Sequence, residues 1–249
     1  MRYQENNVTT WAKRIKAAYA LDETVIAYSL AEQAIAQTNN DPEILEIAGM
    51  LAFDRGELNL AKELIQRAMF EVSLSVSSQL VLAEVAVKDQ NHDEAKLILE
   101  FLVEIADRVP CSLLPRLTHL LSGLRMYQLA LAICREAFRR HPEDDNAVFG
   151  VAFYMYRAGY PLTLVHNVMA RAVEMKPHSS LYRINLAAIC CYLEQWQVAY
   201  DHACEASDAT IRNLPCQCMA TQMKQLFLKF DDHARLKLLE ARTADGGAE

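Results

Sequence analysis

Two cysteines separated by one residue, Cys216 and Cys218, are the side chains best suited to holding a metal ion, and His202 and His233 lie nearby in the sequence. Structural zinc sites use two Cys pairs spaced by about two to four residues, or a paired His motif. Neither pattern is present, and residues two apart on one helix point about 200° from each other. The sequence therefore predicts no metal site.

The paired acids Asp144–Asp145 and Asp231–Asp232 have the chemistry of a general acid and base, but each pair directly precedes an expected helix. A capping role explains them, because carboxylates accept hydrogen bonds from the free N–H groups of a first helical turn. The chain has no Gly-rich phosphate loop, no Gly-x-Ser-x-Gly turn and no His-Glu-x-x-His helix. We therefore expect neither an enzyme nor a cofactor.

A run of aromatic and apolar residues from Phe149 to Tyr156 is the other feature that suggests a site. It is apolar around most of an expected helix, which is more than one buried stripe requires. Two interpretations stay open. Either the helix is buried between its neighbours, or it presents aromatic side chains to an amphipathic helix or hydrophobic peptide. The adjacent Cys190 and Cys191 are interpreted as small core residues, since neighbours on a helix diverge.

The elements that position these side chains repeat about every 34 residues. The clearest copy begins at Pro42, where the small pair Ala48–Gly49 precedes a turn at Gly56 and apolar positions spaced by four and three. Matching copies begin at Val76 and Ser180. A fixed period of this length is typical of stacked helix pairs in which each pair contacts only its neighbours.

Apolar spacing, together with the Pro, Asn and Asp residues at the breaks, predicts seven helix pairs. The expected pairs span residues 8–38, 42–71, 76–106, 111–140, 145–175 and 179–209, followed by a last pair formed by 216–230 and 231–242. We expect residues 1–213 to form the repeat array and residues 214–242 to form a C-terminal capping pair. Residues 243–249 are expected to be disordered.

Residues 8–213 resemble the tetratricopeptide repeat (TPR) family. In that family a small residue of the first helix meets a small residue of the second. Suitable partners here are Ala48 or Gly49 with Ala61, Ala83 with Ala95, and Ala187 with Ala199. Pro142 and Pro177 match the family's proline after the second helix, and Trp11 weakly matches its early aromatic residue. The resemblance implies an all-α fold, a right-handed α-solenoid of antiparallel helix pairs with about six TPR-like repeats.

The resemblance also implies that first helices line a concave groove that holds segments of partner proteins. The family's clamp for chaperone tails needs paired Lys and Asn residues, which are absent from the matching positions Ala12, Lys16, Glu46, Met50, Leu80 and Glu84. The expected partner-binding residues are instead Phe149, Phe153, Tyr156, Ile184, Ala188 and Tyr192. A cationic side suited to an acidic partner would come from Arg116, His119 and Arg157, for which an ordinary solvated role is the alternative.

Composition narrows the class of protein further. A formal net charge of −7 without a basic cluster argues against nucleic-acid binding. The N-terminal residues lack the apolar stretch of a signal peptide. No apolar run reaches about 18 residues, so we expect no membrane-spanning helix. The seven cysteines, an odd number, are expected to be reduced thiols. We expect a cytoplasmic adaptor, scaffold or chaperone that binds another protein. The alternative is a scaffold that self-associates through its apolar face or terminal helices.

Overall fold

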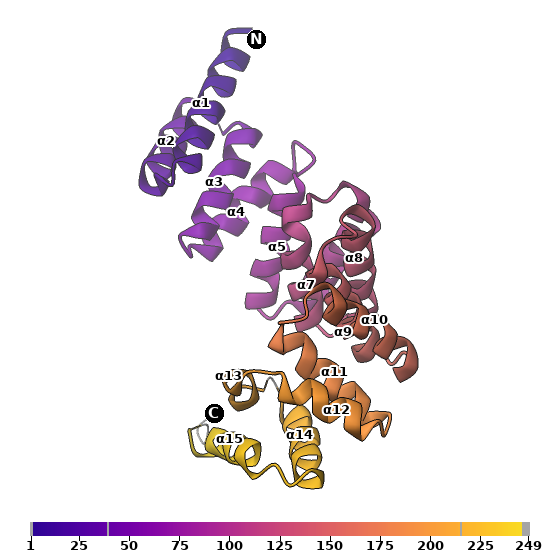
Figure 1. Cartoon of the computed structure of the whole chain (residues 1–249). Helices are drawn as coiled ribbons and strands as arrows, with labels where there is room; N and C mark the ends of the chain where they lie inside the picture. Colours follow the sequence, from indigo (N-terminus) through magenta and orange to yellow (C-terminus); the bar gives the residue numbers. More distant parts are fainter. Residues whose placement is uncertain (1, 39, 215, 246–249) are drawn as a thin grey trace. The chain divides into compact units, whose positions relative to one another are not determined.

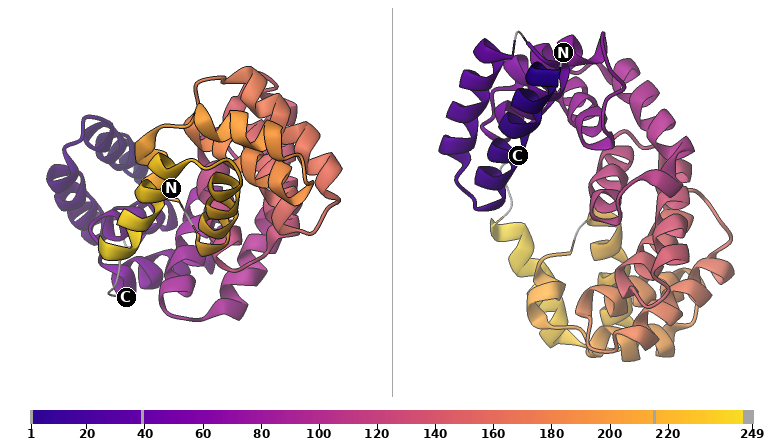
Figure 2. Two further views of the ribbon diagram at one scale, coloured as in Figure 1. Left: turned by 60° about the horizontal axis from the view of Figure 1, so that its bottom comes forward. Right: turned by 90° about the horizontal axis from the view of Figure 1, so that it is seen from above.

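The computed structural model describes residues 2–38, 40–214 and 216–245, and 79% of it is helical. Within those ranges the elements are α-helices and two short 3-10 turns, and there is no β-strand. Most successive α-helices lie side by side in antiparallel pairs (Figure 1 and Figure 2). The predicted all-α fold of paired helices is therefore confirmed. None of the described helices is both long enough and apolar enough to span a membrane.

The chain divides into two compact units, residues 1–124 and residues 125–249. Unit 1 begins with three helix pairs and ends with two 3-10 turns and one further helix. These elements are α1 (Arg2–Ala20), α2 (Thr24–Gln37), α3 (Pro42–Asp54), α4 (Leu58–Met69), α5 (Val76–Lys88), α6 (His92–Glu104), η1 (Ala106–Arg108), η2 (Cys111–Leu113) and α7 (Leu114–Gly123).

Unit 2 contains the remaining eight α-helices of the described residues. They are α8 (Tyr127–Arg140), α9 (Asp145–Arg157), α10 (Leu162–Met175), α11 (Ser180–Tyr192), α12 (Trp196–Cys204), α13 (Asp208–Arg212), α14 (Gln217–Lys229) and α15 (His233–Asp245). The predicted pairs beginning at residues 42, 76, 145 and 179 agree with these helices to within a few residues.

The structure differs from the expected pairs in four places. Helix α1 begins at Arg2, six residues before the expected start of the first pair at residue 8. The break between units falls between α7 and α8, inside the expected fourth pair, and 3-10 turns flank Pro110 because proline cannot continue a helix. The short helix α13 was not predicted; Ser207 starts it by accepting a hydrogen bond from the Thr210 N–H. Helix α15 continues through residue 245, into the expected disordered tail, and residues 246–249 lie outside the described residues.

Side-chain caps begin most of the first helices of the pairs. Asp41, Ser75, Asp144 and Ser179 precede α3, α5, α9 and α11, and each accepts a hydrogen bond from an N–H of the first turn. Asp232 caps α15 in the same way, since its Oδ1 accepts from the Arg235 N–H at 3.0 Å. The predicted capping role is confirmed for Asp144 and Asp232.

The corner between the two helices of each pair, and likewise the turn between α7 and α8, contains one residue with positive φ. These residues are Asp22, Gly56, Gln90, Arg125, Gly159, Glu194 and Asp231, with φ from 51° to 81°. At the corners other than that of Arg125, paired hydrogen bonds close the first helix; after α3, the N–H of Glu57 donates to Ala52 O and that of Gly56 donates to Phe53 O, both at 2.9 Å. This is the Schellman arrangement, which satisfies the last free carbonyl groups of a helix. The chain can then begin the second helix at once.

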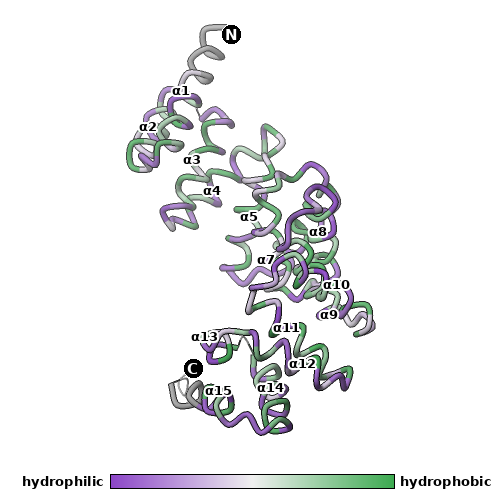
Figure 3. Tube along the Cα trace, viewed as in Figure 1, coloured by the Kyte–Doolittle hydropathy of each residue, from purple (hydrophilic) through white to green (hydrophobic). Residues whose placement is uncertain are grey.

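Small residues let the helices of a pair approach closely. A Cβ added to Gly49 of α3 would lie 2.5 Å from Ile65 Cγ1 and 3.2 Å from Ala61 O of α4. Ala61, Ala95 and Ala199 are all 0% exposed at the matching position of the second helix. The close approach expected between Gly49 and Ala61 is therefore present, and Ala95 and Ala199 are buried as the other two expected contacts require. Apolar segments recur along the helices of both units between polar turns (Figure 3).

The positive φ at the corners gives a direct test of the backbone. We expect Gly56→Ala and Gly159→Ala each to lower the free energy of unfolding by about 1 kcal/mol, because an L-residue is disfavoured there. No other atom lies within 4 Å of either added Cβ, so steric overlap contributes nothing. Gly123→Ala is the matched control, since its site is equally open and has no positive φ. Urea unfolding of the three variants measures the difference, and an equal loss in Gly123→Ala would contradict this explanation.

Candidate partner-binding groove

A groove of about 390 Å³ lies in unit 2, along the first helices α9 and α11 and beside the start of α14. It is lined mainly by apolar and aromatic side chains. The lining residues are Phe149, Phe153, Tyr156, Arg157, Met169, Leu181, Asn185, Ala188, Ile189, Tyr192, Cys216, Cys218 and Met219. Six of the nine residues expected to contact a partner are therefore brought together around one opening.

Helix α9 has one buried side and one side that faces the groove. Ala152, Tyr154 and Met155 are at most 9% exposed and belong to the core. Phe149 and Phe153 are half-buried in the groove wall, and Tyr156 is 37% exposed. The helix is therefore buried on one side, as the first interpretation expects, and leaves aromatic side chains partly open on the other.

The ring of Tyr182 on α11 positions the aromatic wall. It stacks on Phe149 with ring centroids 4.6 Å apart and an interplanar angle of 12°. Its hydroxyl donates to Asp145 Oδ2 at 2.5 Å, and Lys176 Nζ lies 3.1 Å from the same oxygen. The Tyr182 hydroxyl and the Lys176 ammonium hold the pKa of the Asp145 carboxyl below its usual range. These contacts tie the start of α9 to the start of α11, and so fix the rings of the groove.

At the other end of the groove, the rings of Tyr156 and Tyr192 lie 6.3 Å apart and tilted by 33°. Burial, with a smaller effect from a hydrogen bond to Tyr192, raises the pKa of Tyr156 to about 12. The Arg157 guanidinium lies over the Tyr127 ring at 4.5 Å and donates to the Tyr127 hydroxyl. The groove thus ends in Tyr156, which stays protonated at neutral pH, the neighbouring Tyr192 ring, and one cation held by an aromatic ring.

Three of the expected residues do not line the groove. Ile184 is 0% exposed, because it lies off the line of Leu181, Asn185, Ala188 and Tyr192 that faces the opening along α11. Arg116 and His119 belong to α7 of unit 1. The Arg116 guanidinium forms an ion pair with Glu84 and lies over the Phe53 ring at 5.2 Å.

Asn185 is the polar lining residue that the sequence analysis missed. Its side chain is 8% exposed, and its Nδ2 donates to Leu181 O at 2.8 Å. The signal was present in the sequence, since Asn185 stands four residues after Leu181 and three before Ala188 on an otherwise apolar helix. Met219 was missed for another reason: α14 reaches the groove only through the tertiary fold.

The Cys216 and Cys218 side chains were expected to diverge, and this expectation is wrong. Cys216 lies before α14 with φ −151° and ψ 157°, so the 100° rotation per helical residue does not apply to it. A hydrogen bond with the Cys216 thiol, followed by burial, raises the pKa of Cys218. Cys216 Sγ also accepts from the Met219 N–H at 3.4 Å, which caps α14. Within the described residues, no three His, Cys, Asp or Glu side chains are grouped as metal ligands.

Cysteine labelling tests the assignment of Cys190 and Cys191 to the core, which their burial confirms in the structure. Burial raises the pKa of Cys190 to about 11 and that of Cys191 to about 12. At pH 8 we expect both to resist a maleimide, because the thiolate is the reactive form. The exposed Cys111 should react at least about tenfold faster. Mass spectrometry of the labelled peptides reports the order, with urea-unfolded protein as the control; equal rates in the folded protein would contradict it.

No protein-family model and no curated protein matches this sequence. Among solved structures, the TPR protein YrrB, described as having an unusual peptide-binding site, is 19% identical over 86% of this chain and 97% of its own, with a TM-score of 0.58. The C-terminal part of a TPR protein from Cytophaga hutchinsonii is 11% identical over 96% of each chain, with a TM-score of 0.65. A TPR protein from Parabacteroides merdae is 12% identical over 98% of this chain and 94% of its own, with a TM-score of 0.59. At such low identity the likeness concerns the fold, and this chain has the fold of TPR proteins.

Proposed function

We propose that this protein is an interaction module that binds a segment of a partner protein in the groove along α9 and α11. The observation that carries the proposal is the open aromatic wall. Tyr156 and Tyr192 are 37% and 40% exposed beside the half-buried Phe149 and Phe153. Aromatic side chains in a concave apolar site supply much of the affinity of protein interfaces.

The dimensions of the groove indicate what kind of segment it accepts. Its α11 wall runs from Leu181 to Tyr192, which is about 16 Å at the helical rise. That length suits roughly five residues of extended chain, or three helical turns with apolar side chains on one face. Asn185 adds an amide near the middle of this wall, and Arg157 adds a cation at its end. An apolar segment with an acidic end therefore fits best.

Two further observations agree with a binding role in the cytoplasm. The TPR fold is shared with YrrB, which is described as having a peptide-binding site. All seven cysteines are free, as is usual where the surroundings keep thiols reduced. The proposal assigns no catalytic step and no cofactor to the chain.

The experiment begins with a partner recovered by the full-length chain from native lysate and identified by mass spectrometry. We expect Phe153→Ala and Tyr192→Ala each to weaken that partner's affinity about thirtyfold, corresponding to a loss of about 2 kcal/mol. Both variants should melt within a few degrees of the wild type, because these rings are partly open. Binding is measured by titration of the purified pair, and stability is measured by thermal melting.

Phe138→Ala is the matched control, since Phe138 is 42% exposed on α8 of the same unit and does not line the groove. Unchanged affinity in the two groove variants would place the partner elsewhere and contradict the proposal. A loss of about 3–5 kcal/mol of stability would instead assign both rings to the core. Light scattering across a dilution series tests self-association: a dimer that Tyr192→Ala dissociates would make a second copy the occupant.

A further inference from the structure

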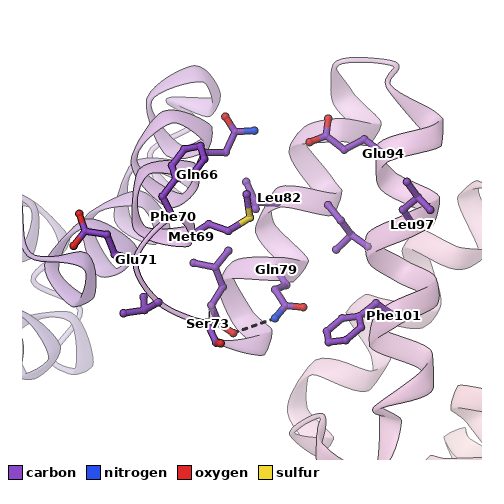
Figure 4. A pocket seen from close by; sticks show the side chains of 13 residues that line it. Gln66, Met69, Phe70, Glu71, Ser73, Gln79, Leu82, Glu94, Leu97 and Phe101 are labelled. Atoms are coloured by element: carbon purple, nitrogen blue, oxygen red, sulfur yellow. Dashed lines mark hydrogen bonds between the residues drawn. The ribbon is translucent and has the colours of Figure 1, made fainter.

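A second opening lies in unit 1, on the side of the second helices rather than the first. It has a volume of about 740 Å³ and lies between α4 and α6, over α5. Figure 4 shows Met69 and Phe70 from one wall, Leu82 from the floor, and Leu97 and Phe101 from the other wall. We call this opening the α4–α6 cleft. It shares no residue with the groove along α9 and α11.

The cleft exposes an unusual amount of apolar surface. Five of its lining side chains are large hydrophobic residues at least 40% exposed: Phe70 at 84%, Leu97 at 70%, Met69 at 49%, Phe101 at 46% and Val72 at 40%. A contiguous patch of this kind on a soluble fold usually marks an interaction site. These side chains contribute little to the packing of the second and third helix pairs, because at least 40% of each is exposed.

The cleft arises from a longer connection between helix pairs. The chain between α4 and α5 has six residues, 70–75, against four at 141–144 and at 176–179. This connection is fixed rather than loose. Leu74 is 9% exposed in the core, its carbonyl oxygen accepts from Gln79 Nε2 at 3.0 Å, and the Ser75 N–H donates to Glu46 Oε1 at 2.8 Å. The cleft is therefore formed before any partner binds.

The charge around the cleft is negative. Glu71 and Glu94 line it, and no Lys or Arg is among its described lining residues. The Lys and Arg side chains of α4 and α6 are already paired: Lys62 with Asp89 and Glu94, Arg67 with Glu63, and Lys96 with Asp93. Lys88 of α5 lies over the Phe53 ring at 5.1 Å. The apolar walls thus carry carboxylates that the chain's own cations do not fully neutralise.

The exposed face of α6 strengthens this argument. Leu97, Glu100, Phe101 and Glu104 follow at spacings of three, one and three, so they share one face of the helix. Both glutamates are exposed in the last two turns, and the last turn has no basic residue. Acidic side chains there oppose the helix dipole, and like charges four residues apart repel. These two glutamates weaken the helix that carries them, and a bound cation would remove that cost.

We propose that the α4–α6 cleft binds an amphipathic helix that presents large apolar side chains on one face and Lys or Arg residues beside them. The apolar side chains would cover Phe70, Leu97 and Phe101, and the cations would meet Glu100, Glu104 and Glu71. This surface is additional to the groove of the proposed function. It selects a basic partner, whereas the groove fits a segment with an acidic end.

The test uses a fluorescent peptide of about 18 residues, or five helical turns, with Leu at spacings of three and four and Lys elsewhere. A peptide with Glu in place of every Lys controls for charge. Fluorescence anisotropy with the full-length chain at about 0.15 M salt should show binding of the Leu/Lys peptide only. Leu97→Ser should weaken it about tenfold. Val25→Ser, at a 75% exposed site on α2 of the same unit, should leave it within about twofold.

Variants that remove the negative charges separate an effect on binding from an effect on folding. The double variant Glu100→Gln, Glu104→Gln should melt at the same or a higher temperature, while it binds the Leu/Lys peptide about tenfold more weakly. Glu32→Gln on α2 is the matched control and should change neither property. Phe153→Ala should bind the peptide as the wild type does, so failure of the groove proposal would leave this result intact.

Three outcomes would overturn the proposal. One is equal binding of the Leu/Lys and Leu/Glu peptides, which would mean that charge does not select the occupant. Another is undiminished binding in Leu97→Ser or in the double glutamine variant. The third is a dimer in light scattering that Leu97→Ser dissociates, because a second copy of this acidic chain would then be what covers the cleft.

Discussion

The left-handed residue at each helix corner is the constraint on which this structure depends. A helix that ends in the Schellman arrangement satisfies its last carbonyl groups within its own backbone, so the next helix can begin two residues after the residue with positive φ, as α4 does after Gly56. That short corner forces the second helix back along the first. Each pair then has a buried seam of small residues, such as Gly49 against Ala61, and its remaining faces are available for the next pair or for a ligand.

The sequence predicts these pairs through the spacing of apolar residues more than through turn residues. Gly56 and Gly159 are glycines, the residue type that predicts a positive φ at a corner. Gln90, Arg125 and Glu194 adopt the same conformation although their residue types do not predict it. Periodicity compensates, because a buried seam needs apolar residues at fixed positions on both sides of the corner. The spacing of apolar residues predicts neither the short helix α13 nor the break between units. Both depend on where the neighbouring helices end.

The residues of the candidate groove could be predicted where they share one helix. They could not be predicted where contacts with residues distant in the sequence determine which way a side chain points. Phe149, Phe153 and Tyr156 follow at spacings of four and three, so their common face was evident from the sequence. Arg116 was misjudged because its ion pair with Glu84 joins residues 32 positions apart. The α4–α6 cleft was missed altogether, since it depends on how a connection of six residues sets two helix pairs apart, which no local pattern records.

The two surfaces show how a stack of helix pairs can combine stability with binding. The seam inside a pair supplies the packing, so a helix such as α9 can bury Ala152 and Met155 on one side while Phe153 and Tyr156 remain partly open on the other. Helix α6 shows the same division, with Ala95, Leu99 and Leu102 at 0% exposure behind Leu97 and Phe101. Because the buried side already secures each helix, the open side tolerates side chains that weaken it locally, including Glu100 and Glu104. Exposed rings and unneutralised carboxylates on such a helix are therefore not required by the fold, and they agree with the binding roles proposed for the open sides.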